Sequence, residues 1–456
     1  MTEQLAIEWK AGVTDAPLAP MVNPEDLRGA HNIFVEQYRK LGPIFRLPQR
    51  SSGRPLIVLA GPDANAFIAR YEDEFFTTQE QWQEFDAAMH IEGTTDRSMA
   101  RDGQANKQRR AQASRTYSRT RVLDQLADMV DITIAHTQSW QPGTSIAVRP
   151  AMQRIVSEQL GQLLVHFGPG EYLQDFIAYL DTSIKSAFGE DEQARQALSA
   201  PEFLRAKERV LELGRAVLEE HRRHPRVSGK PDMIDEILER AAQDPEHYPE
   251  SALELAGLGP FLVGLDTVAN TCSFMTYALL KNPDVLDRVL QEVDAAWSRC
   301  DFSWETLKQL TTLHGAAMET LRLYPVATGH RARVAQPLSY AGYQLSPGDD
   351  VFVAMTVSHF LPELYPEPER FDIDRYREPR NEHRQRGAYF PFGLGNHTCL
   401  GAGIAEIEIM VTMATLFHRY QLSMDPVDYQ LSIEHDPTPA PGKNFRIKVD
   451  ALRHSS

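Results

Sequence analysis

The chain has 456 residues, of which 42% are hydrophobic and 24% are charged. This composition is that of a folded globular protein, and a chain of this length can bury a large core without disulfide bonds. The formal net charge of −16 gives a surface that repels nucleic-acid phosphates and anionic lipids, so we expect neither as a partner. The three cysteines are far apart and form no C-x-x-C pair, which is typical of a reduced cytosolic protein.

The N-terminal region predicts no targeting segment. Residues 1–20 lack a basic stretch followed by an apolar one, so we expect no secretory signal. No window approaches the roughly 20 apolar residues that span a bilayer, so we expect a cytoplasmic protein without a membrane anchor. No shift in composition marks a boundary, and residues 1–456 are therefore interpreted as one domain with residues 1–20 as an extension.

The first predicted elements are two strands, followed by helices. Short apolar runs at Ile44–Leu47 and Leu56–Ala60 flank a turn-rich segment, 49–53, and predict a pair of strands. Farther along, apolar residues recur at three- and four-residue spacing, for example at 123–137 and Pro201–Arg223, and predict helices.

The strongest helix prediction covers residues 251–281. A capping-box pattern begins at Ser251, and Pro283 follows the expected end. Because the segment is apolar nearly all round, we expect it to lie buried through the middle of the fold. Two interior residues should kink or loosen it, Pro260 and Gly264.

The C-terminal third predicts a helix, short strands and a last long helix. The helix covers 307–323, the strands fall within 338–354, and the last helix runs from about residue 401 to about residue 420. Helices and strands never alternate regularly. The sequence therefore predicts a mainly α fold with a minor β part.

Residues 390–403 contain four glycines and one thiol directly before the last helix. Glycines at this density permit positive φ angles and let the backbone approach another group closely. A cysteine just ahead of a helix N-terminus has its thiolate stabilised by the helix dipole and by free N–H groups. The pattern suits a thiolate that ligates a metal on one open side, and the alternative is a buried cysteine in a tight turn.

This segment resembles the haem-binding loop of the cytochrome P-450 superfamily, F-x-x-G-x-x-x-C-x-G, through Phe392, Gly395, Cys399 and Gly401. The resemblance implies that Cys399 is the axial ligand of a haem iron, where a thiolate favours O–O cleavage. It also implies that Phe392 packs near the sulfur and that Gly395 makes room for the loop. His397 stands where the family has a residue that bonds a haem propionate.

Glu319 and Arg322 lie three residues apart on one predicted helical face and can form an ion pair. Alone, such a pair is more often an exposed one. The stretch 365–371 follows at the distance that the family shows. The resemblance implies that Arg370 joins Glu319 and Arg322 in a buried network with a structural role.

An acid and a hydroxyl, Asp266 and Thr267, lie within the apolar helix and fit the family pattern A/G-G-x-D/E-T, with Val263 at its variable first position. Thr267 could simply donate to a carbonyl one turn earlier. The resemblance implies instead that this segment lies over the distal face of the haem, with space beside Gly264. Asp266 and Thr267 would then relay protons to the oxygen bound there.

The segment 102–110 resembles the family helix that contacts the haem propionates. Arg110 falls in register, whereas Asn106 stands at the usual Trp or His position and leaves that contact open. A second propionate ligand is expected in the strand around residue 332. Alignment to the following glycine favours Arg333, with Arg331 as the competitor.

By resemblance, a substrate pocket is lined by two segments of mainly apolar residues: Phe261, Leu262 and Leu265, then Val326, Ala327 and Thr328. These residues suggest a hydrophobic substrate such as a terpenoid, steroid, fatty acid or polyketide. Sterol demethylases usually carry a His where Asp266 stands, which makes that activity less expected.

The resemblance covers about residues 20–450 and implies a triangular α-helical prism with a small β-rich lobe. It implies haem b as the cofactor and a monooxygenase that hydroxylates or epoxidises a small molecule with dioxygen. No flavin or iron–sulfur domain is fused, so electrons from NAD(P)H should arrive through a separate ferredoxin and ferredoxin reductase. We expect a monomer that docks this partner near Arg109 and Arg115. Two alternatives stay open: an enzyme of this fold that uses peroxide or rearranges its substrate, and a haem-based gas sensor.

Overall fold

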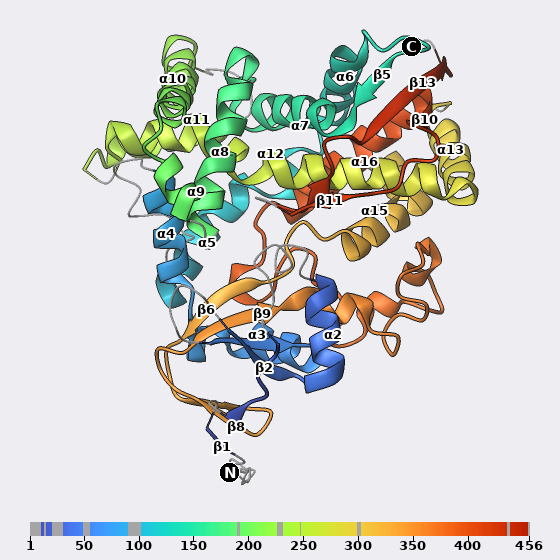
Figure 1. The fold of residues 1–456 in the computed structure, drawn as a ribbon. Coiled ribbons are helices and arrows are strands. Elements are labelled where there is room, and N and C mark those ends of the chain that lie inside the picture. The colour runs from blue at the N-terminus through green and yellow to red at the C-terminus, as the bar shows by residue number, and fades with distance from the viewer. Residues whose placement is uncertain are drawn as a thin grey trace.

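The computed structural model describes residues 11–12, 15–20, 31–48, 55–89, 102–188, 192–225, 231–246, 248–298, 302–435 and 438–454. Helices form most of these residues, and the largest sheet lies at the same end of the molecule as α2 (His31–Leu41) and α3 (Pro62–Phe75) (Figure 1). The predicted mainly α fold with a minor β part is confirmed.

The helices follow one another along the chain with few interruptions by strands. In order they are α2 (His31–Leu41), α3 (Pro62–Phe75), α4 (Gln79–Met89), α5 (Gly103–Thr116), α6 (Leu126–Thr137), α7 (Val148–Val165), α8 (Leu173–Phe188), α9 (Glu192–Ala197), α10 (Pro201–Arg223), α11 (Met233–Gln243), α12 (Glu250–Lys281), α13 (Pro283–Trp297), α14 (Trp304–Gln309), α15 (Thr311–Leu323) and α16 (Ala402–Arg419). The helix predicted at Pro201–Arg223 and the long helix after the glycine-rich loop are confirmed.

The β lobe is a five-stranded sheet in the order β2-β3-β9-β6-β4. Its strands are β2 (Ile44–Leu47), β3 (Leu56–Ala60), β4 (Phe76–Thr77), β6 (His330–Val334) and β9 (Asp350–Ala354). β3 and β9 are parallel and the other neighbours antiparallel. The two predicted N-terminal strands pair as expected, and their turn lies outside the described residues.

Three smaller sheets complete the described strands. The first joins β1 (Ala11–Gly12), β8 (Tyr343–Leu345) and β7 (Leu338–Tyr340). The second, near the C-terminus, joins β10 (Tyr420–Asp425), β13 (Arg446–Leu452) and β5 (Ser145–Ala147). The third pairs β11 (Ile433–Glu434) with β12 (Ala440–Pro441).

Helix α12 crosses the middle of the fold and packs against α7, α10 and α16 (Figure 1). The predicted capping box is wrong, because Ser251 lies inside the helix and Pro249 precedes its first turn without a side-chain cap. Among the described helices, α12 is the one long and apolar enough to cross a bilayer. Its packing among the other helices explains that composition, since a core helix is apolar on every side.

The helix predicted at 307–323 is two helices, α14 and α15, with a break at Leu310. Each piece has its own N-terminal cap. The Ser303 hydroxyl accepts from the Thr306 N–H in α14, and the Glu292 carboxylate of α13 accepts from Thr312 and Leu313 at 2.9 and 3.0 Å. The sequence near the break does not show this second cap, because its donor is another helix.

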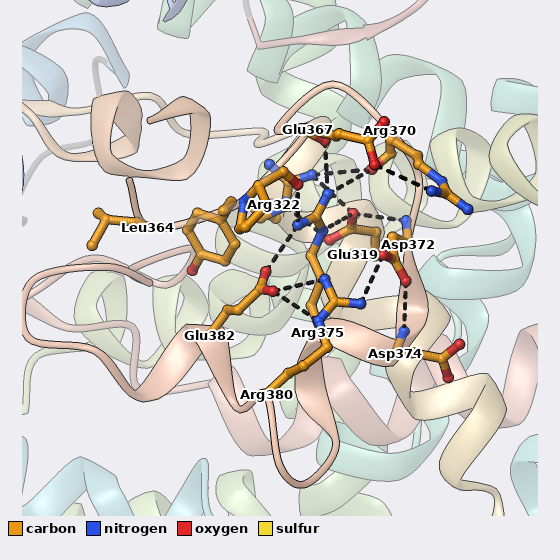
Figure 2. A network of polar contacts seen from close by, with 12 residues as sticks. Glu319, Arg322, Leu364, Glu367, Arg370, Asp372, Asp374, Arg375, Arg380 and Glu382 are labelled. Atoms are coloured by element: carbon orange, nitrogen blue, oxygen red, sulfur yellow. Dashed lines mark hydrogen bonds and ion pairs between the residues drawn. The ribbon is translucent and has the colours of Figure 1, made fainter. Parts of the chain in front are cut away.

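Glu319 is a fully buried carboxylate at the centre of a polar network (Figure 2). Arg322 donates to both of its oxygens at 2.8 Å. Arg375 donates at 3.2 Å, the Tyr376 hydroxyl at 2.7 Å and the Asp372 N–H at 3.0 Å. Five hydrogen bonds to one carboxylate offset the desolvation that its burial costs.

The predicted role of Arg370 in this network is wrong, because Arg375 takes that place. The Arg370 side chain is 65% exposed and pairs with Glu367, and only its backbone carbonyl faces the network. Arg375 has no exposed surface, and beyond Glu319 it donates to Glu382 at 2.8 Å and to backbone carbonyls. A buried guanidinium needs all of these acceptors, and the fold supplies them only at position 375.

A second buried polar cluster joins the ends of three helices around Asp232, the N-cap of α11. His221 donates from one nitrogen to the Val217 carbonyl and from the other to Asp232, at 2.8 and 2.7 Å. Two acceptors require both nitrogens to carry protons, so the ring is an imidazolium. Burial alone would lower the pKa of His221, but these bonds outweigh it and raise the pKa. Burial would likewise raise the pKa of Asp232, yet bonds from His166 and His221 hold it well below its usual range.

We expect Arg375→Gln to destabilise the protein by about 3–5 kcal/mol, because it leaves two buried carboxylates short of a charged partner. Arg370→Gln is the matched control and should change the free energy of unfolding by less than about 0.5 kcal/mol, since its side chain lies in solvent. Urea unfolding of both variants measures the difference. Equal losses in the two variants would contradict the assignment.

We expect the contribution of His221 to stability to depend on pH. Its pKa is raised on folding, so its contribution is complete below its unfolded pKa and declines as pH rises through the folded pKa. The contribution of Asp232, with a lowered pKa, declines instead as pH falls. The difference in unfolding free energy between wild type and His221→Gln should therefore shrink from mildly acidic to alkaline pH. A difference that grows with pH would exclude a buried imidazolium.

Candidate functional site

The glycine-rich loop before α16 presents the Cys399 thiol with an exposed side. The Cys399 N–H donates to the Phe392 carbonyl at 2.8 Å and closes the loop. Burial against the loop raises the pKa of the thiol, whereas the Gly401 N–H, the Arg110 guanidinium and the Ala402 N–H lower it. Burial prevails over these groups, and a cation on the open side would favour the thiolate.

Gly395 is where the loop meets helix α3. Its φ of +66° favours glycine, and a Cβ there would overlap the Glu72 carboxylate. Glu72 is buried, accepts from the Asn396 N–H at 2.8 Å and lies 3.1 Å from His397 Nδ1. The sequence interpretation missed Glu72. Its signal was a carboxylate four residues after Ile68, on the buried stripe of α3.

His397 is held by side chains from outside its own loop. Its Nε2 lies 3.0 Å from the Thr78 hydroxyl and 3.3 Å from Asn106 Nδ2. Asp102 lies 3.5 Å from the same nitrogen. Asn106, which departs from the family pattern, is buried and also donates to the Asn396 carbonyl at 3.3 Å. Its place in α5 therefore supports the cysteine loop.

The predicted arginines occupy different surroundings. Arg110 of α5 donates to the Thr398 carbonyl, one residue before the thiol. Burial lowers the pKa of Arg110, and the nearby Cys399 and Glu72 offset part of this. Arg333 of β6 pairs with Asp350 at 2.9 Å and with Glu80, so two carboxylates already engage its guanidinium. Arg331 lies two residues away on the same face of β6.

A short stretch of the buried helix α12 is accessible around Val263, whose side chain is 50% exposed. Leu262, Gly264 and Thr267 beside it are partly exposed. The Thr267 hydroxyl lies 3.3 Å from the Val263 carbonyl and 3.4 Å from the Gly264 carbonyl, so the bond to the preceding turn that the sequence allowed is present. Val263, Gly264 and Thr267 are therefore residues of α12 that a ligand could contact.

Asp266 is turned toward helix α7. Its Oδ1 accepts from Gln153 Nε2 at 2.7 Å and lies 3.7 Å from Arg149 Nη2, whereas Oδ2 has no hydrogen-bond partner among the described residues. Only 4% of the residue is exposed. Gln153 and Arg149 could not be identified as partners of Asp266 from local patterns, because both lie more than 100 residues away on another helix.

The predicted pocket lining is partly wrong. Phe261 and Leu265 are almost fully buried, and Phe261 packs edge-on against Phe176 with ring centroids 5.8 Å apart. Both belong to the core, because they lie on the face of α12 turned away from Val263. The remaining predicted residues keep accessible surface: Leu262, Val326, Ala327 and Thr328.

Comparison with known proteins connects this geometry to a family. A family model described as cytochrome P450 matches residues 21–449. A putative cytochrome P450 136 of Mycobacterium tuberculosis is 26% identical over 430 residues, covering 91% of this chain and 84% of the relative. The cyclooctat-9-en-7-ol 5-monooxygenase of Streptomyces melanosporofaciens is 26% identical, covering 75% of each chain. A sterol 14alpha-demethylase of Mycolicibacterium vanbaalenii is 33% identical over 45% of this chain and 48% of its own.

Solved structures agree on the fold. The retinoic acid bound cyanobacterial CYP120A1 superposes with a TM-score of 0.78 at 22% identity, covering 95% of this chain and 98% of that one. The cytochrome P450DA heme domain gives 0.80 at 19% identity, covering 97% of each. The family model matches nearly the whole chain, and the matched residues include the thiol before α16 and the acid and hydroxyl of α12. The chain belongs to the cytochrome P450 family, and it is an oxidoreductase of the monooxygenase class.

Proposed function

We propose that Cys399 ligates the iron of haem b and that the protein hydroxylates or epoxidises a hydrophobic small molecule. The observation that carries this proposal is the exposed Cys399, held by the bond from its N–H to the Phe392 carbonyl three residues before α16 begins. The N-terminal end of the helix favours a thiolate there, and the exposed side leaves a position for a metal. The family uses haem, and the residues around the sulfur fit it.

The residues that would hold the haem come from three elements. Arg110 of α5, His397 of the loop, and either Arg333 or Arg331 of β6 are the candidates for the propionates. Arg333 would have to exchange Asp350 or Glu80 for the propionate. When bound, the haem supplies activation of dioxygen, with one oxygen atom inserted into the substrate and the other leaving as water after uptake of two electrons and two protons.

Asp266 and Thr267 are the proposed proton donors on the opposite side. Thr267 lies on the accessible stretch of α12 and holds its own proton on a weak backbone bond. Asp266 is the nearest acid along the helix, and Gln153 holds one of its oxygens. For transfer, the Asp266 carboxyl must exchange this contact for one with Thr267 or with water, because adjacent helical residues point about 100° apart.

The substrate that we propose is an apolar molecule of the terpenoid, steroid, fatty acid or polyketide kind. The accessible residues of α12 and of the segment 326–328 are mainly aliphatic, and aliphatic surface favours such ligands. The relative that acts on cyclooctat-9-en-7-ol, a cyclic alkenol by its name, supports the terpenoid class.

We propose that the electrons come from NAD(P)H and pass through a ferredoxin reductase to a ferredoxin. The ferredoxin then binds this protein, which we propose to be a cytoplasmic monomer. The expected docking residues Arg109 and Arg115 have side chains outside the described ones. Their neighbour Arg110 reaches the carbonyl preceding Cys399, which places α5 beside the thiolate loop. A partner bound at this helix would stand close to the iron, as electron transfer requires.

Replacing Cys399 tests the ligation. The reduced wild-type protein with carbon monoxide should show the red-shifted Soret band of a thiolate ligand. Cys399→Ser should lose that band, because a serine oxygen does not replace the thiolate. Cys272→Ser is the matched control and should keep it, since Cys272 lies buried within α12. A wild-type protein without the band, or a band unchanged in Cys399→Ser, would end the proposal.

Removing the acid tests proton delivery. Asp266→Asn keeps an oxygen that can accept from Gln153, so we expect normal folding and an unchanged carbon monoxide band. Product formation with the reductase and ferredoxin should fall by about a hundredfold, the lower range for loss of a proton donor.

Thr267→Ala should also lose product, whereas Thr276→Ala, which removes a buried hydroxyl of the same helix, should not. Hydrogen peroxide turnover as fast as the reconstituted chain, together with an indifferent Thr267→Ala, would instead favour the peroxide-using alternative.

A further inference from the structure

Three potential metal ligands meet at the C-terminal end of α16, the end away from the cysteine loop. His418 Nδ1 lies 2.9 Å and His454 Nε2 lies 3.5 Å from the same oxygen, Oδ1 of Asp294. All three ligand atoms lie within 4.8 Å of one another. With metal–ligand distances of about 2.0–2.1 Å, tetrahedral ligand atoms stand about 3.3 Å apart, so the spacing of this set is close to that of a metal site.

The cluster is built on two rigid elements and one accessible segment. Asp294 lies in the last turn of α13 and His418 in the last turn of α16, whereas His454 follows β13 and is exposed. Both helices therefore point the negative ends of their dipoles at the cluster, which favours a cation. The cluster is far from the cysteine loop, because His418 lies 16 residues, or about 24 Å of helix, from Ala402 at the other end of α16.

Neighbouring side chains hold Asp294 and His418 in place. Arg453 donates to the other Asp294 oxygen at 2.7 Å and leaves Oδ1 to the two imidazoles, and a hydrogen-bonded carboxylate is a common outer-sphere support of metal sites. The ring of Trp297 stacks on His418 at 4.6 Å. The His454 ring lies nearly parallel to His418 at 4.3 Å, so the exposed His454 side chain must turn before both imidazoles can share one ion.

A second group of possible ligands among the described residues surrounds Asp232, but its atoms already satisfy one another. His221 bonds the Val217 carbonyl through one ring nitrogen and Asp232 through the other, so neither nitrogen is left for a metal.

We propose that Asp294, His418 and His454 bind a zinc ion that ties the C-terminal segment to α13 and α16. Two imidazoles and one carboxylate are a common zinc set, and the accessible side of the cluster leaves the fourth position to water. Because zinc binds the folded chain and not the unfolded one, it raises the free energy of unfolding of the protein. The ion takes no part in the oxygenation.

The test uses the haem-loaded protein, freed of any affinity tag and treated with EDTA, and zinc chloride as the only added metal. Calorimetric titration should show that the wild-type protein binds one zinc ion per chain tightly. His454→Gln and His418→Gln should each weaken this binding by at least about tenfold. Loss of a residue that only supports a ligand already costs about that much, and loss of a ligand should cost no less. His454 is exposed, so its variant should fold normally, and an unchanged carbon monoxide band verifies this.

His224→Gln is the matched control, because His224 is also exposed and lies 3.0 Å from a single carboxylate, Glu220. It should bind zinc as wild type does. Zinc-edge X-ray absorption should show nitrogen and oxygen neighbours at about 2.0–2.2 Å. Zinc should also raise the melting temperature of wild type and of His224→Gln but not of His454→Gln. Absence of tight zinc binding, equal binding in His454→Gln, or sulfur among the neighbours would overturn the proposal.

Discussion

The site depends on how the loop before α16 is held while one side of its sulfur stays open. A loop of four glycines has little preference for one conformation, and fixing each residue costs about 1–2 kcal/mol of backbone entropy. Hydrogen bonds from elsewhere in the chain offset this cost. Glu72 accepts from the loop backbone, Asn106 and Arg110 donate to its carbonyls, and N–H groups at the start of α16 lower the pKa of the thiol. The thiol is therefore positioned by α3, α5 and α16 together.

In the Glu319 network, hydrogen bonds from distant residues likewise offset an unfavourable free energy, here the desolvation of a buried charge. A fully buried carboxylate is destabilising unless its oxygens are satisfied, and five donors from α15 and the segment around Tyr376 satisfy them here. The network fixes a proline-rich stretch, in which short 3₁₀ helices at Ile373–Tyr376 and Glu382–Arg384 are the regular elements described, against a helix. Because this stretch leads into the cysteine loop, the network supports the site without contacting it.

Helix α12 is both a core helix and the carrier of polar residues, and burying polar groups in a core is unfavourable. Most of its surface is core, and yet it carries an acid, a hydroxyl and an exposed valine in one turn and a half. Asp266 is stabilised by Gln153 on α7, so the buried acid depends on a neighbouring helix rather than on its own. Such a residue is costly in a packed interior, and its presence there is best explained by the chemistry of the site.

The sequence by itself determined the family, the mainly α fold, the strands at Ile44–Leu47 and Leu56–Ala60 and the thiol at Cys399, because these depend on local periodicity and on short motifs. The tertiary structure alone decided which arginine joins Glu319, where residues 307–323 break, which side chains of α12 are core, and that Glu72 holds the loop. In each of these cases the deciding partner lies on another element. A local pattern carries no information about which distant donor or acceptor will be close enough to satisfy a buried charge.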